Sequence, residues 1–376
     1  MRHSAFAGLC FLIVACVQNH ADRSPYFGEI DAEAKRLMAM EDVKGMALAI
    51  VEDGQVVHLA AFGHRNVDRD FTLQTDTIMY GASFTKTAFA YMVLQLVDAG
   101  LVDLDRPLNQ YLPQPLPTYD KYADLAGDDR WRSVTARHVL THSTGYANFR
   151  WLEEDRRLRF HFEPGERYAY SGEGFNLLQF ALEEGLGFDV RAEMQRRVFD
   201  RFDMPNTSLQ WRPDFAGNLA DGYTMDGSFK PHDKRRNVSA AGSMDTTIED
   251  QARMWAGILR GDGLSQNSRS ELIRPQLDIA SAHQFPTLVE DTDVRARQIG
   301  LSAGLGLVTF GHGADKSWFK GGHDRGTGNI VVCQEAHRRC IVLLSNSVRA
   351  ELIYPDMVSF AFGETGLPWW WEYNRD

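Results

Sequence analysis

Hydrophobic and polar positions along the chain form β-like patterns near both ends and helical patterns in the middle. Near the N-terminus, residues 29–40 have a helical pattern, and two strand-like runs at 46–52 and 55–61 are separated by Asp53-Gly54. An Asp-Gly pair between β-prone runs is a strong signal for a two-residue hairpin turn. The pattern therefore predicts a helix followed by a β-hairpin at the start of the folded chain.

The middle of the chain has helical spacing interrupted by long loops. A strongly apolar helix is predicted over residues 87–99, with Gly100 as the residue that ends it. Further helices are predicted over 135–142, 175–184 and 247–259.

β character returns from about residue 303 and continues almost to the C-terminus. The predicted strands are 304–309, 317–320, 329–332 and 341–345, followed by a helix over 352–362 and an aromatic tail at 368–371. We interpret the tail as packing against its own sheet. The β-rich ends and helical middle indicate an α/β unit with a helical insertion.

Composition and charge narrow the classes of function. The chain has 376 residues, of which 44% are hydrophobic and 24% charged, as in an ordinary globular protein with a substantial core. The formal net charge of −11 argues against nucleic acid as a partner, because that needs a basic face. It also argues against adhesion to anionic membranes by charge alone.

The first residues have the pattern of an export signal. Arg2 and His3 precede an apolar run over residues 5–17, which is too short to span a bilayer. The run ends in Ile-Val-Ala-Cys, which resembles a bacterial lipobox in which Cys16 would be acylated. We favour a lipoprotein signal within residues 1–20; ordinary signal cleavage nearby is the alternative.

Two cysteines outside this leader, Cys333 and Cys340, flank a predicted hairpin turn centred on Ala336-His337. Such a turn places them directly opposite each other, at a spacing that suits a disulfide. An oxidising compartment would permit the bond. Two buried free thiols are the alternative.

Ser83 and Lys86 stand three residues apart at the start of the apolar helix. Positions three apart share a helix face, with Cβ atoms about 5–6 Å apart. A lysine that is partly neutral can accept a serine proton, and N–H groups at a helix N-terminus stabilise an oxyanion. The pair is a candidate nucleophile and base. A serine N-cap with a solvated lysine is the alternative, and a second Ser-x-x-Lys occurs at 317–320.

Other polar residues are weaker candidates. His138 and His142 are spaced i,i+4 and could bind a metal on one helix face. No glutamate follows the first histidine and no third ligand is near, so we interpret both as structural and predict no metal and no other cofactor. Tyr170, in a loop, could act as acid or base if a cation lowered its pKa.

In order and spacing, three motifs resemble those of the penicillin-recognising serine hydrolases, the family of class C β-lactamases, D,D-peptidases and related esterases. Ser-Phe-Thr-Lys at 83–86 matches the family's Ser-x-x-Lys. Tyr-Ser-Gly at 170–172 resembles Tyr-x-Asn, and Lys-Gly-Gly at 320–322 resembles Lys-Thr-Gly. The resemblance covers about residues 30–362.

The resemblance implies an α/β (α+β) fold in which an antiparallel sheet is flanked by helices. Residues 21–376 would be one catalytic domain. Its α/β lobe would comprise about residues 25–82 and 296–376, and a mainly helical lobe would comprise about 83–295. The site would lie in the cleft between the lobes.

The resemblance also implies roles for individual residues. Ser83 would attack a carbonyl to form an acyl-enzyme, and Lys86 would accept or relay its proton. Tyr170 would act on the leaving group and help to activate the deacylating water. Lys320 would supply positive charge and pair with a substrate carboxylate, and Gly322 would allow close approach of the substrate.

The backbone N–H groups of Ser83 and His323 would form the oxyanion hole. Two residues depart from the family pattern: Gly172 replaces an asparagine beside the substrate amide side chain, and Gly321 replaces a Thr or Ser that helps to hold a substrate carboxylate. Both departures favour an esterase-like or otherwise specialised hydrolase.

The sequence therefore predicts an exported, periplasmic serine hydrolase, with membrane contact only through a lipid anchor. Its substrate would be a small-molecule or cell-wall-derived ester, amide or β-lactam. The alternative is a penicillin-binding or cell-wall ligand-binding module that keeps the fold and turns over little or nothing.

Overall fold

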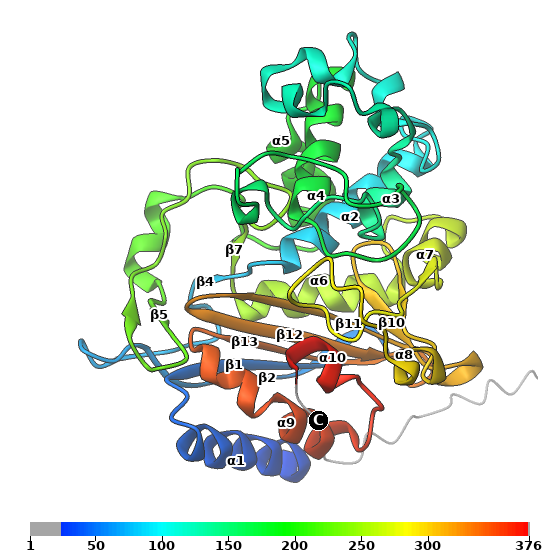
Figure 1. Cartoon of the computed structure of the whole chain (residues 1–376). Coiled ribbons are helices and arrows are strands. Elements are labelled where there is room, and N and C mark those ends of the chain that lie inside the picture. Colours follow the sequence, from blue (N-terminus) through cyan, green and yellow to red (C-terminus); the bar gives the residue numbers. More distant parts are fainter. Residues whose placement is uncertain (1–23, 375–376) are drawn as a thin grey trace, which may run out of the picture.

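The computed structural model describes residues 24–374, which fold around a nine-stranded sheet with helices on both faces (Figure 1). The strand order is β3-β2-β1-β13-β12-β11-β10-β9-β8, and every neighbouring pair is antiparallel. Strands from the N-terminal part of the chain pair directly with strands from the C-terminal part. The predicted antiparallel sheet built from both chain ends is confirmed.

The bounds of the elements are as follows. The strands of the large sheet are β1 (Gly45–Glu52), β2 (Gln55–Asn66), β3 (Phe71–Thr72), β8 (Leu277–Asp278), β9 (Ser302–Ala303), β10 (Val308–Phe310), β11 (Ser317–Asp324), β12 (Thr327–Gln334) and β13 (Arg339–Ser345). Two small sheets pair β4 (Met79–Tyr80) with β7 (Asp245–Thr246), and β5 (Gly222–Tyr223) with β6 (Phe229–Lys230). The α-helices are α1 (Ser24–Met40), α2 (Phe84–Asp98), α3 (Ala136–Leu140), α4 (Gly172–Phe180), α5 (Val190–Met194), α6 (Ile248–Arg260), α7 (Gln266–Ile273), α8 (Val294–Gln298), α9 (Tyr354–Phe362) and α10 (Trp369–Tyr373).

Strand β1 shows why the sheet needs helices on both faces. Its residues from Gly45 to Val51 are all buried. Alternate side chains of a strand point to opposite faces. Ala47 and Ala49 accordingly belong to one hydrophobic cluster, whereas Leu48 and Ile50 belong to a second. A continuous apolar run of this kind is typical of a strand covered on both sides.

Different parts of the chain cover the two faces. Helices α1 and α9 pack together below the sheet in Figure 1, and α6 lies above it against β1, β2 and β13. Helices α2, α3, α4 and α5 stand above α6 in Figure 1, where they form the mainly helical part of the molecule. Helix α6 and strand β8 pack with the sheet, although they lie inside the range of 83–295 expected for the helical lobe.

Two local predictions are confirmed, a tight turn and a disulfide. Asp53 and Gly54, with φ of 48° and 71°, form the predicted turn between β1 and β2. In the β12–β13 hairpin, Cys333 lies opposite Cys340 and the two form a disulfide, the first of the two alternatives. Cys16 and the predicted signal segment lie outside the described residues. Across residues 24–374, no helix is both long and apolar enough to span a bilayer.

One helix prediction is wrong in its extent. The segment expected to be helical over 135–142 forms a helix only over Ala136–Leu140, and His142 follows in a left-handed conformation with φ of 55°. His138 and His142 therefore do not share a helix face. The His138 ring takes part in the capping box at the start of α3, through the Thr135 N–H.

Candidate active site

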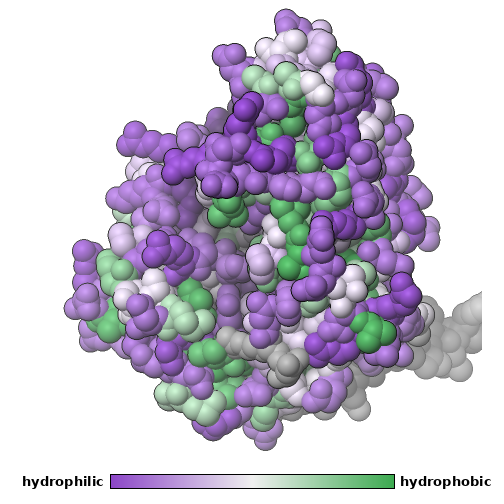
Figure 2. Space-filling view, viewed as in Figure 1, coloured by the Kyte–Doolittle hydropathy of each residue, from purple (hydrophilic) through white to green (hydrophobic). Residues whose placement is uncertain are grey.

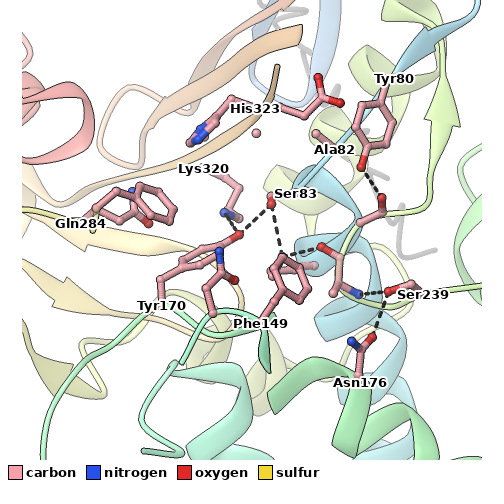
Figure 3. Close-up of a pocket in the computed structure, with 18 of the residues that line it drawn as sticks. Tyr80, Ala82, Ser83, Phe149, Tyr170, Asn176, Ser239, Gln284, Lys320 and His323 are labelled. Atoms are coloured by element: carbon pink, nitrogen blue, oxygen red, sulfur yellow. Dashed lines mark hydrogen bonds between the residues drawn. The ribbon is translucent and has the colours of Figure 1, made fainter. Parts of the chain in front are cut away.

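Ser83 lies between the short strand β4 and helix α2. It is the N-cap of α2, directly after Ala82, which has a φ of 45°. A left-handed conformation is uncommon for a residue with a side chain and costs about 1–2 kcal/mol. This turn exposes the serine to the cavity shown in Figure 3. Its N–H donates no hydrogen bond to any group of the described chain, so it is free to receive an oxyanion.

Lys86 reaches Ser83 from one turn further along the same helix. Its Nζ lies 3.2 Å from Ser83 Oγ and also donates to the Ala241 carbonyl. The side chain is buried, and burial together with the positive charge of Lys320 holds the lysine pKa well below its ordinary value. A neutral lysine is a competent base for the serine proton.

Tyr170 approaches Ser83 from the loop before α4. Its hydroxyl lies 2.7 Å from Ser83 Oγ, and its ring stacks on His142 with 4.1 Å between centroids. Burial raises the pKa of the phenol, although Lys86 and Lys320 both lie within 5 Å of the ring centroid. The lowered tyrosine pKa considered from the sequence is therefore not found. Burial therefore favours the neutral phenol, which can donate a proton.

His142 supports Tyr170 from behind. Its Nδ1 accepts a hydrogen bond from the Ser171 N–H at 3.0 Å, and burial holds its pKa well below the ordinary value. A neutral, buried ring of this kind fixes the orientation of the tyrosine that stacks on it. In the described part of the chain, no group of three or more His, Cys, Asp or Glu side chains could hold a metal.

Lys320 completes a chain of contacts with the tyrosine. Its Nζ donates to Tyr170 OH at 3.4 Å, and the side chain is buried (Figure 3). Ser317, the serine of the second Ser-x-x-Lys, lies on the same strand, β11. Residues three apart in a strand point to opposite faces. The second copy of the motif therefore cannot form a serine–lysine pair.

Strand β11 passes very close to the nucleophile. A Cβ added to Gly322 would lie 3.2 Å from both Ser83 N and Gly81 O. Glycine at this position therefore lets the strand approach the start of the helix. The next residue of the strand, His323, also lines the cavity.

The cavity around Ser83 has a volume of about 490 Å³. Figure 2, seen in the same direction as Figure 1, shows a hollow in the face of the molecule between the sheet and the helical part. The cavity is lined by six residues predicted from the sequence: Ser83, Lys86, Tyr170, Lys320, Gly322 and His323. Further lining residues were not predicted, among them Tyr80, Asn148, Phe149, Trp151, Asn176, Ser239, Gln284, Phe285 and Glu372.

Two of the missed residues occupy the space left by the glycines that depart from the family motifs. A Cβ on Gly172 would lie 2.4 Å from Cε1 of Phe149, whose ring faces the cavity (Figure 3). A Cβ on Gly321 would lie 1.9 Å from Oε1 of Glu372. The place of each missing side chain is therefore filled by a residue that is distant in sequence. For the pair of Gly321 and Glu372, the sequence offered only one signal, a single glutamate directly after the aromatic tail.

The matching family model places the chain in the class of the penicillin-recognising serine hydrolases, and the fold agrees with this class. The chain belongs to the Beta-lactamase family, whose model matches residues 30–355.

Characterised and uncharacterised relatives are identical to this chain at about a quarter of the aligned positions. An uncharacterised protein of Alkalihalophilus pseudofirmus is 27% identical over 290 residues, covering 74% of this chain and 80% of the relative. The D-alanyl-D-alanine-carboxypeptidase/endopeptidase AmpH of Escherichia coli is 24% identical over 298 residues, covering 74% and 72%. The ML-236A carboxylate methylbutanoyltransferase mlcH of Penicillium citrinum is 26% identical over 225 residues. This last match spans 51% of this chain and 54% of the relative.

Solved structures share the fold. The D-alanine carboxypeptidase AmpC from Burkholderia cenocepacia superposes with a TM-score of 0.71 at 18% identity, covering 91% of this chain and 99% of that one. The octameric penicillin-binding protein homologue from Pyrococcus abyssi gives a TM-score of 0.69 at 19% identity, covering 89% and 76%.

Proposed function

We propose that the protein is a serine hydrolase that forms an acyl-enzyme at Ser83 and acts on esters with an apolar acyl group. The observation that supports this most directly is the position of Ser83 Oγ, 3.2 Å from Lys86 Nζ and 2.7 Å from Tyr170 OH. A nucleophile needs a base within hydrogen-bond reach and an oxyanion site beside it. The N–H groups of Ser83 and His323 are the donors we propose for that oxyanion site.

In the proposed acylation, the net proton transfer is from the Ser83 hydroxyl to the leaving oxygen, through Lys86 and Tyr170. Ser83 Oγ attacks the ester carbonyl carbon while its proton passes to the neutral amine of Lys86. The bond to the leaving oxygen then breaks, and Tyr170 delivers a proton to that oxygen while the proton on Lys86 restores the phenol. In deacylation, water attacks the acyl carbon and gives one proton to Lys86 and Tyr170. These groups return the proton to Ser83 Oγ as its bond to the acyl carbon breaks, which releases the acid and the free Ser83 hydroxyl.

The acyl-binding side of the cavity is aromatic, which supports apolar acyl groups. The ring of Phe149 stacks on Trp151 at 4.0 Å between centroids, and Trp151 is 58% exposed at the cavity rim. Arg150 fixes this loop by binding Glu173 of α4 at 2.9 Å. Gly172 supplies no amide side chain for a peptide-like acyl group, and Phe149 fills the space instead.

We further propose that the protein is exported. The apolar leader supports this, as does the disulfide between Cys333 and Cys340, a bond that is typical of oxidising compartments. The relatives named as a carboxypeptidase/endopeptidase and as a methylbutanoyltransferase indicate that the acyl group could pass to water or to another acceptor. We propose water, and measurement of the released acid tests that choice.

The central experiment compares wild type, Ser83→Ala and Ser317→Ala with p-nitrophenyl butyrate. We expect Ser83→Ala to reduce kcat by about a thousandfold or more, whereas Ser317→Ala, the matched control in the second Ser-x-x-Lys, retains activity. Intact-mass analysis after rapid quenching should show a butyryl adduct on the wild type and none on Ser83→Ala. Unchanged turnover by Ser83→Ala would refute the assignment. A permanent adduct without turnover would favour the binding-module alternative.

A further inference from the structure

Glu372 is a buried carboxylate in the wall of the cavity that contains Ser83. It lies on the short C-terminal helix α10 and is 6% exposed. The Gln284 amide donates to its Oε2, and Tyr168 OH donates in turn to Gln284 Oε1 at 3.2 Å. Its neighbour Trp371 is fully buried and anchors the helix through a hydrogen bond from Nε1 to Ser281 Oγ at 3.2 Å. The carboxylate is therefore held in place by a built network.

The carboxylate occupies the position next to β11 that a side chain at 321 would fill. The three heavy atoms nearest to a Cβ on Gly321 are all in the Glu372 carboxyl group, at 1.9, 3.0 and 3.9 Å. Only glycine at 321 accommodates Glu372 in this position. The departure from the Lys-Thr-Gly pattern and the glutamate in the tail are therefore one structural feature.

The charges in this part of the cavity leave little attraction for an anion. Burial raises the pKa of Glu372, and the positive charge of Lys320 opposes that rise. Burial lowers the pKa of Lys320, and the negative charge of Glu372 opposes that fall. Each group favours the charged form of the other, so above the Glu372 pKa of about 7 the carboxylate offsets part of the charge of Lys320. A substrate carboxylate would have to displace Glu372 or lie beside it, and like charges at close range repel strongly.

The position of Lys320 shows which part of a substrate meets this carboxylate. Lys320 contacts Tyr170, the group that we propose delivers a proton to the leaving oxygen. We propose that Glu372 is a specificity-determining residue that excludes substrates with a carboxylate on the leaving-group side. The enzyme then acts on neutral leaving groups. This inference rests on the proposed acyl transfer at Ser83.

The test uses two aryl esters that differ only in charge, 3-acetoxybenzoate and 3-acetoxybenzamide. In buffer above the Glu372 pKa of about 7, where the carboxylate is charged, wild type should prefer the neutral amide-bearing ester in kcat/KM. Glu372→Gln keeps the shape and removes the charge, so we expect it to shift this ratio towards the carboxylate ester by about tenfold to a hundredfold. The matched control is Glu364→Gln, an exposed glutamate outside the cavity lining, which should leave the ratio unchanged.

A binding measurement separates failure of this inference from failure of the proposed hydrolysis. Calorimetry with 3-hydroxybenzoate and 3-hydroxybenzamide, the leaving groups of the two esters, reports the same charge preference without any turnover. Weaker binding of the carboxylate compound to wild type, relieved in Glu372→Gln, supports the inference even if the esters are not cleaved. A ratio that stays within twofold of wild type in Glu372→Gln, in turnover or in binding, overturns it. Ester cleavage that survives in Ser83→Ala refutes the proposed function alone.

Discussion

The steric exclusion between Gly321 and Glu372 gives a sharp prediction about stability. In Gly321→Ala the new Cβ would lie 1.9 Å from Glu372 Oε1, whereas ordinary contacts begin at 3.4 Å. The carboxylate must then move by about 1.5 Å, or β11 must shift. Overpacking of this kind costs about 1–3 kcal/mol. We expect the free energy of unfolding of Gly321→Ala to fall by that amount.

The same contact predicts how a second substitution changes this cost. Glu372→Ala alone leaves the Gln284 amide without its acceptor, at a cost of about 1–3 kcal/mol. Once the carboxylate is gone, every remaining atom lies at least 3.9 Å from the new Cβ at position 321. Adding Gly321→Ala to Glu372→Ala should therefore cost almost nothing, which gives a coupling free energy of about 1–3 kcal/mol.

Urea denaturation of wild type, the two single variants and the double variant measures this cycle. Gly217→Ala is a matched control, since a Cβ at 217 has no atom within 4 Å, and its midpoint should stay close to wild type. If the free-energy changes of the two substitutions simply add, the contact between position 321 and Glu372 is not the reason for the glycine. The argument for a filled carboxylate position then loses its basis.

Two further predictions concern Lys86 and Phe149. Burial and the charge of Lys320 hold the Lys86 pKa in the folded chain below the ordinary value of 10.5, which applies to the unfolded chain. At pH values between these two pKa values, Lys86 therefore binds a proton in the unfolded chain but not in the folded chain. The stability of wild type relative to an inactive Lys86→Met variant should therefore rise with pH across that window, and a pH-independent difference in urea midpoints would contradict a neutral Lys86. With p-nitrophenyl acetate, butyrate and hexanoate, kcat/KM of wild type should rise with chain length, by up to about fourfold per methylene. Phe149→Ala should flatten the series and Leu152→Ala, at an exposed residue outside the cavity lining, should not; an equally steep series in Phe149→Ala would exclude the ring as an acyl-binding surface.

Much of the fold was predictable because the pattern that specifies it is local. The Asp53-Gly54 turn needs only two residues with positive φ, and Gly100 ends α2 with a φ of 69°. The opposed positions of Cys333 and Cys340 follow from the short turn between them. The order of the Ser-x-x-Lys, Tyr and Lys-Gly-Gly motifs was enough to bring Ser83, Tyr170 and Lys320 together through the family resemblance.

The rest of the site depends on packing between distant segments, which no local pattern records. Tyr170 lies beside two lysines, yet burial decides its pKa, and burial follows only from the folded structure. The left-handed conformation of His142 turns its ring under Tyr170 instead of along a helix face. Glu372 directly follows the predicted aromatic tail; Trp371 packs as expected, whereas the carboxylate of Glu372 lines the cavity.

The two motif glycines acquire a different meaning once their neighbours are known. From the sequence alone, Gly172 and Gly321 are losses of an amide and a hydroxyl, which would suit a module that no longer catalyses. In the structure, Phe149 and Glu372 fill both places, and each would clash with the side chain that the family pattern has there. The contacts of Ser83 Oγ with its two partners are meanwhile kept. A site that has lost its function has no need for packed replacements at both recognition positions, so the pairing favours a change of substrate over a loss of catalysis.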